Sequence, residues 1–197
     1  MKKAIIKAVS DAVKIKKGIL EDNELLEKIS AVAEEMVSAF KGGGKVLFCG
    51  NGGSAADAQH LAAELSGRFY YDRPPLDAEA LHVNTSYLTA VANDYSYDYI
   101  YSRLARSKGR KGDILVGLST SGNSKNVINA FEVADEIGMI TVGMTGETGG
   151  AMRAACAHLI NIPSKDTPRI QEAHILVGHI ICELVEVRLF PRPGYLI

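Results

Sequence analysis

From residue 45 onward, short apolar runs alternate with longer amphipathic stretches, and this alternation limits the possible folds more than any other feature of the chain. The apolar runs cover residues 45–49, 80–83, 114–118, 140–144 and 159–162. The stretches with helical spacing cover residues 54–66, 86–107, 124–137 and 150–156. Strands that alternate with helices form βαβ units, and nearly continuous apolar strands are typical of a parallel sheet buried on both faces. The sequence therefore predicts an α/β fold.

Two amphipathic helices are predicted before this region, over residues 3–20 and 22–40. In the first, Ile5, Val9 and Val13 recur at intervals of four, which places them on one face of a helix. Three consecutive glycines end the second helix. Both apolar faces need a covering surface, which could be the core or a second subunit. The sequence leaves both alternatives open.

The chain of 197 residues has the length of one domain. We expect a single domain over residues 1–197, in which helices of residues 1–41 precede an α/β core at 45–190. A last helix is predicted over residues 168–189, where it ends before two prolines. We expect the tail after Phe190 to be loosely held.

The formal net charge of -1 provides no general attraction for nucleic acid or an anionic membrane, so neither is expected as a partner. The three cysteines are Cys49, Cys156 and Cys182. Their odd number and wide spacing argue against a disulfide framework and against a thiolate zinc site. The N-terminus is interrupted by lysines and resembles neither a signal peptide nor a spanning helix. These features predict a cytoplasmic protein.

A glycine-rich turn follows the first predicted strand and precedes a predicted helix. It consists of Asn51, Gly52, Gly53 and Ser54. Glycines allow close approach of a ligand to the backbone, and free N–H groups at a helix N-terminus suit an anion. Ser54 could cap the helix or donate to a phosphate oxygen. The turn alone is a weak signal, because a strand–helix turn also needs glycine for its geometry.

A cluster of hydroxyl groups follows the third predicted strand. Ser119, Thr120, Ser121 and Ser124 lie within six residues, just before a helix. In an open parallel sheet, ligands bind beyond the carboxyl ends of the strands. Hydroxyls and backbone N–H groups there favour phosphate binding, which agrees with the neutral net charge. A simple capping loop is the alternative.

Histidines and carboxylates share helix faces in two places. His60 and Glu64 are four residues apart, and Arg68 continues the same row. Gln171 and His179 lie within one half of the last helix but are separated by about 12 Å of rise. These side chains could be metal ligands, an acid and a base, or structural residues.

Four segments together resemble the phosphoheptose isomerases: GNGGSAADAQHLAAELSGRF, ANDY, GLSTSGNSKNV and PRIQEAHILVGHIICELVE. These enzymes of the sugar-isomerase (SIS) domain family convert sedoheptulose 7-phosphate to D-glycero-D-manno-heptose 7-phosphate for cell-surface heptose synthesis, such as that of lipopolysaccharide. The resemblance extends over nearly the whole chain. It implies a three-layer sandwich, flavodoxin-like or Rossmann-like, with a five-stranded parallel sheet flanked by helices. It also implies a homotetramer with active sites between subunits.

The resemblance further implies the roles of individual residues. Substrate would be bound by Asn51, Gly52, Gly53, Ser54, Arg68, Asn93, Asp94, Ser119, Thr120, Ser121, Ser124 and Gln171. One Zn²⁺ per subunit would be held by His60, Glu64, Gln171 and His179. Glu64 would be the base and His179 the acid of an aldose–ketose isomerisation through an enediol. Gln171 could orient the substrate instead of binding the metal.

The sequence departs from the family pattern around the second strand, at Asp77, Glu79, His82 and Asn84. Two other functions remain as alternatives. One is a non-catalytic sugar-phosphate-binding SIS protein of the replication-initiator-associated type, which lacks the acid and the histidine that stand here as Glu64 and His179. The other is an isomerase of a different sugar phosphate, because fold alone does not separate such enzymes.

Overall fold

The computed structural model describes residues 1–192 and 194. The strands are β1 (Val46–Gly50), β2 (Ala78–Ala80), β3 (Ile114–Ser119), β4 (Ile140–Thr145) and β5 (His158–Asn161). The α-helices are α1 (Lys2–Glu21), α2 (Asn23–Lys41), α3 (Gly53–Ser66), α4 (Thr85–Asp94), α5 (Ile100–Lys108), α6 (Lys125–Glu136) and α7 (Thr167–Leu189). Two short 3₁₀ helices are η1 (Tyr97–Tyr99) and η2 (Gly150–Ala154).

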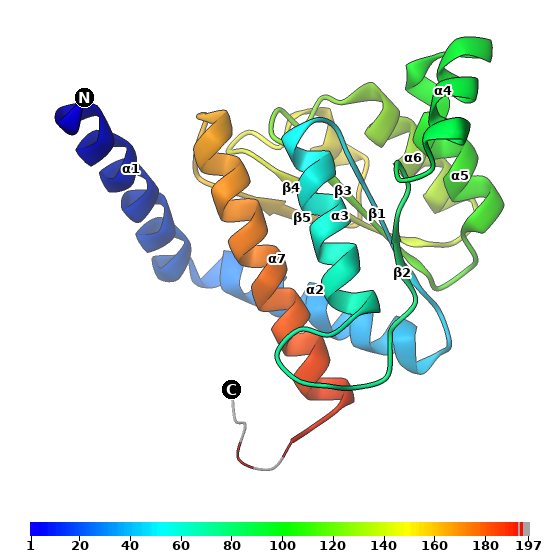
Figure 1. Ribbon diagram of the computed structural model, residues 1–197, viewed down its shortest axis with the longest axis horizontal. Coiled ribbons are helices and arrows are strands. Elements are labelled where there is room, and N and C mark those ends of the chain that lie inside the picture. The colour runs from blue at the N-terminus through cyan, green and yellow to red at the C-terminus, as the bar shows by residue number, and fades with distance from the viewer. Residues whose placement is uncertain (193, 195–197) are drawn as a thin grey trace.

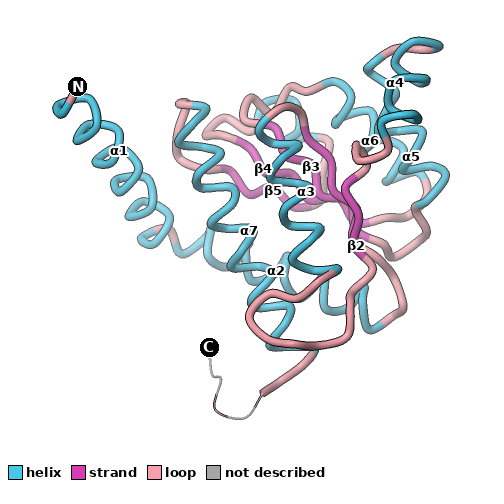
Figure 2. Tube along the Cα trace, in the orientation of Figure 1, coloured by secondary structure: helices cyan, strands magenta, loops and turns pink. Residues whose placement is uncertain are grey.

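The strands form one parallel sheet in the order β2-β1-β3-β4-β5 (Figure 2). The chain therefore moves outward from β1 to β2, and then returns to the other side of β1 to add β3, β4 and β5. This order is that of flavodoxin-like folds, and it confirms the predicted α/β class. It creates a switch point between β1 and β3, where the helices that follow the two strands leave toward opposite faces of the sheet.

Helices cover both faces of the sheet and make three layers. Val46 and Phe48 of β1 pack into one apolar cluster with α2, α3 and α7. Leu47 and Cys49 of the same strand pack into a second cluster with α5 and α6. Alternate residues of β1 therefore face opposite helical layers. Figure 1 shows α3 and α7 side by side in one of these layers, on one face of the sheet.

The two N-terminal helices differ in their packing. α2 buries much of its length against the core, with Leu25, Ile29 and Val32 nearly inaccessible. α1 projects away from the body of the protein (Figure 1), and its apolar residues Ile5 and Val9 are 63% and 59% exposed. The stripe predicted on the first helix is therefore uncovered within a single chain.

Some predicted boundaries were wrong. The helix predicted over residues 86–107 is divided into α4, η1 and α5, because the Ser96 side chain accepts a hydrogen bond from Asp98 N in place of a helical bond. The helix predicted over 150–156 is only the 3₁₀ turn η2, which starts at glycines in left-handed conformation. β2 begins two residues earlier than predicted. Glu79 interrupts its apolar pattern, and edge strands tolerate such residues.

Within residues 1–192 and 194, no helix is both long and apolar enough to cross a membrane. All three cysteines are free thiols. The prediction of a loosely held tail falls largely on residues 193 and 195–197, which lie outside the described residues.

Candidate active site

Two loops lie side by side at the carboxyl edge of the sheet, because β1 and β3 are neighbours in register. Gly50 pairs with Leu118, so the glycine-rich turn and the hydroxyl loop both begin at this edge. The loops are further joined by the amides of Asn51 and Asn126, which donate to each other at 2.9 Å in both directions. This edge is the switch point, where open α/β sheets bind their ligands.

The glycine-rich turn leads directly into α3. Gly52 is the N-cap residue and has a φ of 57°, so a glycine and not Ser54 occupies the capping position. Ser54 is buried within the first turn. The Gln171 side chain of α7 lies against Gly53, where an added Cβ would be 2.5 Å from the Gln171 amide nitrogen. Gly53 therefore permits the amide of Gln171 to reach the start of α3.

The hydroxyl loop gathers serine side chains around one point. Ser119 Oγ is 2.8 Å from Ser124 Oγ and 3.4 Å from Ser121 Oγ. Ser124 is the N-cap residue of α6, yet its side chain makes no capping hydrogen bond. A loop that served only to cap the helix would use this hydroxyl for that purpose. The free N-terminus of α6 and the converging hydroxyls are together suited to a phosphate group.

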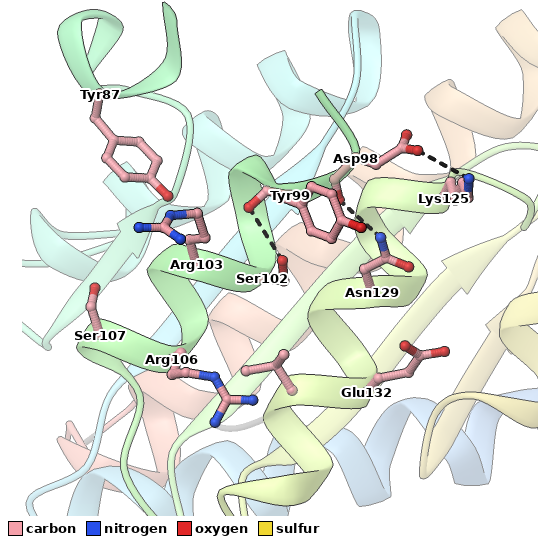
Figure 3. A pocket seen from close by; sticks show the side chains of 11 residues that line it. Tyr87, Asp98, Tyr99, Ser102, Arg103, Arg106, Ser107, Lys125, Asn129 and Glu132 are labelled. Atoms are coloured by element: carbon pink, nitrogen blue, oxygen red, sulfur yellow. Dashed lines mark hydrogen bonds and ion pairs between the residues drawn. The ribbon is translucent and has the colours of Figure 1, made fainter. Parts of the chain in front are cut away.

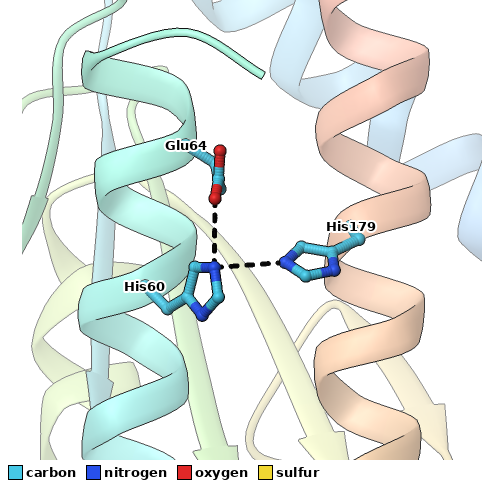
Figure 4. Close-up of side chains that lie close together, drawn as sticks. All are labelled: His60, Glu64 and His179. Carbon is cyan, nitrogen blue, oxygen red and sulfur yellow. Dashed lines mark hydrogen bonds and ion pairs between the residues drawn. The ribbon is translucent and has the colours of Figure 1, made fainter. Parts of the chain in front are cut away.

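α3 and α7 run side by side, and glycine sets their spacing. A Cβ added at Gly178 would lie 2.5 Å from the Cδ atoms of Leu61, so a larger residue would fit only if the Leu61 side chain or one of the helices moved. The contact brings the next residue of α7, His179, opposite His60 of α3 (Figure 4).

His60, Glu64 and His179 form one cluster across these two helices (Figure 4). His60 Nε2 is 3.0 Å from Glu64 Oε1 and 3.4 Å from His179 Nε2. One potential ligand atom from each residue lies within 4.8 Å of those of the other two. Two imidazole nitrogens and one carboxylate oxygen form the ligand set of several catalytic zinc sites, which leave a further position open. The cluster therefore fits a metal ion.

Burial affects the charges around this cluster. Burial, together with the neighbouring His60, lowers the pKa of His179, while Glu64 opposes the shift. The lowered pKa favours the neutral imidazole, which is the form that a metal ligand requires. Burial raises the pKa of Asp57, which lies on the same face of α3 as Gly53 and His60. The Oδ2 atom of Asp57 is buried without a hydrogen-bond partner among the described residues.

Comparison with known proteins identifies the family. Residues 10–146 match the SIS domain family. The phosphoheptose isomerase of Aneurinibacillus thermoaerophilus is 51% identical over 182 residues, which is 92% of each chain. A phosphoheptose isomerase structure from Neisseria gonorrhoeae has a TM-score of 0.88 and 41% identity, and covers 94% of this chain and 98% of that one. A phosphoheptose isomerase structure from Francisella tularensis has a TM-score of 0.89 and 34% identity, and covers 93% and 96%.

The chain belongs to the phosphoheptose isomerase family. It is an isomerase of sugar phosphates, with the SIS-domain α/β fold that its sequence predicted.

In this family member, three other predicted site residues, Arg68, Asn93 and Asp94, are not members of the metal-type cluster. Asn93 and Asp94 lie at the end of α4, where the Asn93 amide donates to Asp94. Arg68 is exposed just beyond the C-terminus of α3. Asn84, a departure from the family pattern, caps α4 by accepting a hydrogen bond from Tyr87 N.

Three residues at the site were missed by the sequence analysis. Asn126 and Tyr97 both bond to Asn51, with Tyr97 Oη donating at 3.1 Å. Asp57 could have been found from its spacing, because it falls between Gly53 and His60 on one helical face. The pairing of Asn126 with Asn51 gives no signal in a single sequence, because it depends on the register of β1 and β3.

A polar groove of about 740 Å³ lies in the opposite layer, between α5 and α6 (Figure 3). Its lining contains none of the predicted site residues. Its cations are largely neutralised, since Lys125 pairs with Asp98 at 3.1 Å and Arg106 pairs with Glu136. This groove is therefore not the centre of the predicted chemistry.

Proposed function

We propose that this enzyme converts sedoheptulose 7-phosphate to D-glycero-D-manno-heptose 7-phosphate. The observation that carries the proposal is the cluster of His60, Glu64 and His179, which unites an acid–base pair with a metal-type ligand set on two adjoining helices. The names of the relatives at about half identity support the choice of a heptose phosphate.

The reaction moves one proton between carbons and one between oxygens. We assign Glu64 as the base that removes the proton from C1 of the ketose, which leaves an enediol, and that returns a proton to C2. Protonated His179 donates its proton to the carbonyl oxygen at C2 and then takes up the proton that leaves the hydroxyl at C1, so that it ends the cycle as it began. The product is the aldose, with no net gain or loss of atoms. A positioned acid and base commonly contribute about 10²–10⁴-fold each to the rate of such transfers.

We propose Zn²⁺ as the metal, bound by His60, Glu64 and His179. When bound, the ion supplies a Lewis acid that polarises the substrate oxygens. The position of Gln171 favours a role in orienting the substrate over a role as a metal ligand. Its amide lies at Gly53, and Gly53 is seven residues, or about 10 Å along α3, from His60. Asp57 lies between these points and is placed to accept a hydrogen bond from a sugar hydroxyl.

The phosphate group is assigned to Ser119, Thr120, Ser121 and Ser124, at the N-terminus of α6. This loop and the metal-type cluster occupy different parts of one chain. We therefore propose that the active site is completed across subunits of a homotetramer, which brings Asn93, Asp94 and Arg68 of one chain toward another. The uncovered apolar face of α1 supplies contact surface for such an assembly.

The direct test is to incubate the purified protein with sedoheptulose 7-phosphate and to follow the sugars by NMR. A pentose phosphate and a hexose phosphate serve as parallel substrates. Conversion of the heptose phosphate alone supports the proposal, whereas preferential conversion of another sugar phosphate replaces the substrate. If the protein binds one of the three sugar phosphates but converts none of them, the result supports the alternative of a non-catalytic sugar-phosphate-binding protein.

The metal is tested separately at His60. A chelator should reduce the rate, Zn²⁺ should restore it, and His60→Ala should lose both metal and activity. Full activity of His60→Ala, with no metal found by elemental analysis, would remove zinc from the mechanism.

A further inference from the structure

A buried ion pair lies directly behind the cluster of His60, Glu64 and His179. Arg73 Nε is 3.0 Å from Glu186 Oε1, and the two side chains are 1% and 0% exposed. Buried ion pairs are a weak source of stability, because desolvation offsets much of their attraction. Full burial of this pair therefore calls for another explanation.

Arg73 fixes the end of the helix that carries the proposed base. Its Nη2 donates to the backbone carbonyl of Glu64 itself at 2.8 Å. Its Nη1 donates to the carbonyls of Leu65, Gly67 and Pro74 at 2.7, 3.1 and 3.0 Å. The last carbonyls of a helix have no partner within the helix and carry partial negative charge. The guanidinium supplies these partners and holds the last turn of α3 in one position.

Glu186 fixes the environment of the proposed acid. Its two carboxylate oxygens accept hydrogen bonds from the backbone N–H groups of Phe69 and Tyr70, at 2.9 and 2.7 Å. The Phe69 ring in turn packs on His179, with 5.5 Å between the ring centroids. Glu186 therefore holds the backbone segment that presses an aromatic ring against the imidazole.

We propose that Arg73 and Glu186 are positioning residues, which set the separation of Glu64 from His179. Arg73 holds the backbone of Glu64, and Glu186 holds the segment that packs on His179. The ion pair between Arg73 and Glu186 links these two supports. The hydrogen bonds of Arg73 and Glu186 described above go to backbone atoms and not to the functional groups of the cluster, so both act through the backbone of α3 and through Phe69. The proposal rests on the proposed roles of Glu64 and His179. The alternative is that the pair contributes to stability alone.

The test compares Glu186→Gln and Arg73→Lys with a matched control, Asp113→Asn. Asp113 is likewise a buried carboxylate that accepts two backbone N–H bonds, from Lys45 and Arg110, and pairs with the Lys45 ammonium at 3.3 Å. It lies just before β3, at the amino edge of the sheet, and none of these bonds involves α3 or α7. For each protein, kcat, KM, thermal stability and the Zn²⁺ affinity in competition with a chromophoric chelator are measured.

Glu186→Gln and Arg73→Lys should lower kcat and Zn²⁺ affinity by about tenfold or more, the usual effect of losing support behind metal ligands, while KM changes less than about threefold. Asp113→Asn should lose thermal stability but keep kcat and Zn²⁺ affinity. The proposal is overturned if Glu186→Gln and Arg73→Lys keep the wild-type kcat and Zn²⁺ affinity. It is also overturned if Asp113→Asn loses as much kcat and Zn²⁺ affinity as these variants at the same loss of thermal stability. Should Glu186→Gln not fold, Arg73→Lys decides, because it keeps a cation opposite Glu186.

Glu64→Gln in the same assays separates this proposal from the proposed function. An active Glu64→Gln protein refutes the assigned base. An inactive Glu64→Gln protein beside fully active pair variants refutes only the positioning role.

Discussion

Replacing Glu64 by Gln tests the proposed chemistry most directly, because it removes the basic carboxylate and keeps its size. A positioned general base contributes roughly 10²–10⁴-fold to rate, which corresponds to about 3–5 kcal/mol of activation free energy. The effect on folding should be small. The Glu64 side chain is 25% exposed and pairs with a half-exposed His60, and such pairs contribute about 1 kcal/mol or less. The catalytic loss should therefore far exceed any change in stability.

The assay is steady-state turnover of the heptose phosphate, with thermal unfolding and metal content measured on the same sample. We expect kcat to fall by about 10²–10⁴-fold, KM to change little because the hydroxyl loop is untouched, and the melting temperature to fall by at most about 4 °C. Glu24→Gln is the matched control, since Glu24 forms an i,i+4 pair with Lys28 on another helix. A rate within about threefold of wild type, with metal retained, would refute Glu64 as the base.

Three further predictions concern other parts of the molecule. Ser121→Ala and Ser124→Ala should raise KM more than they lower kcat, because the phosphate contact is equal in ground and transition states; unchanged KM in both would move the phosphate elsewhere. Light scattering at micromolar concentration should show a tetramer, and Val9→Asp on the uncovered face of α1 should weaken it; a monomeric wild type contradicts the shared site. Burial lowers the pKa of His174 to about 4, below that of the unfolded chain, so its stabilisation is complete above about pH 6.5 and is lost as pH falls toward 4. Chemical denaturation should show wild type losing up to about 3 kcal/mol more than His174→Gln over this range, and equal losses would contradict the assignment.

The sheet could be predicted from the sequence because its central strands are apolar on both faces. β1, β3 and β4 were placed within a residue, since their side chains pack against helices in two layers. β2 was misplaced because Glu79 is half-exposed at the edge and pairs with Lys108 at 2.5 Å. The break between α4 and α5 was missed because it depends on one hydrogen bond that the Ser96 side chain accepts from Asp98 N, which helical periodicity does not record.

The candidate site was predictable only where it follows local spacing. His60 and Glu64 were paired by their positions on one helix, but spacing alone left the relation of Gln171 to His179 open. The structure separates these two side chains, with Gln171 against Gly53 and His179 against His60. Arg73 and Glu186 gave no signal, because they are 113 residues apart and meet only after α3 and α7 have packed.

The geometry of the site depends on the lack of a side chain at Gly178, where α7 packs closely against α3. Within a helix, glycine is less favourable than alanine by about 1 kcal/mol, so an alanine here would favour α7 taken alone. In the folded protein its methyl group would meet the buried Leu61 side chain, which must then either turn within the core or move α7 away from α3. In the second case His60 and His179 would separate with the helices, since each lies one residue from this contact. Substitutions chosen to strengthen the helices of this enzyme should therefore spare position 178, where a more stable helix comes with a wider and less effective site.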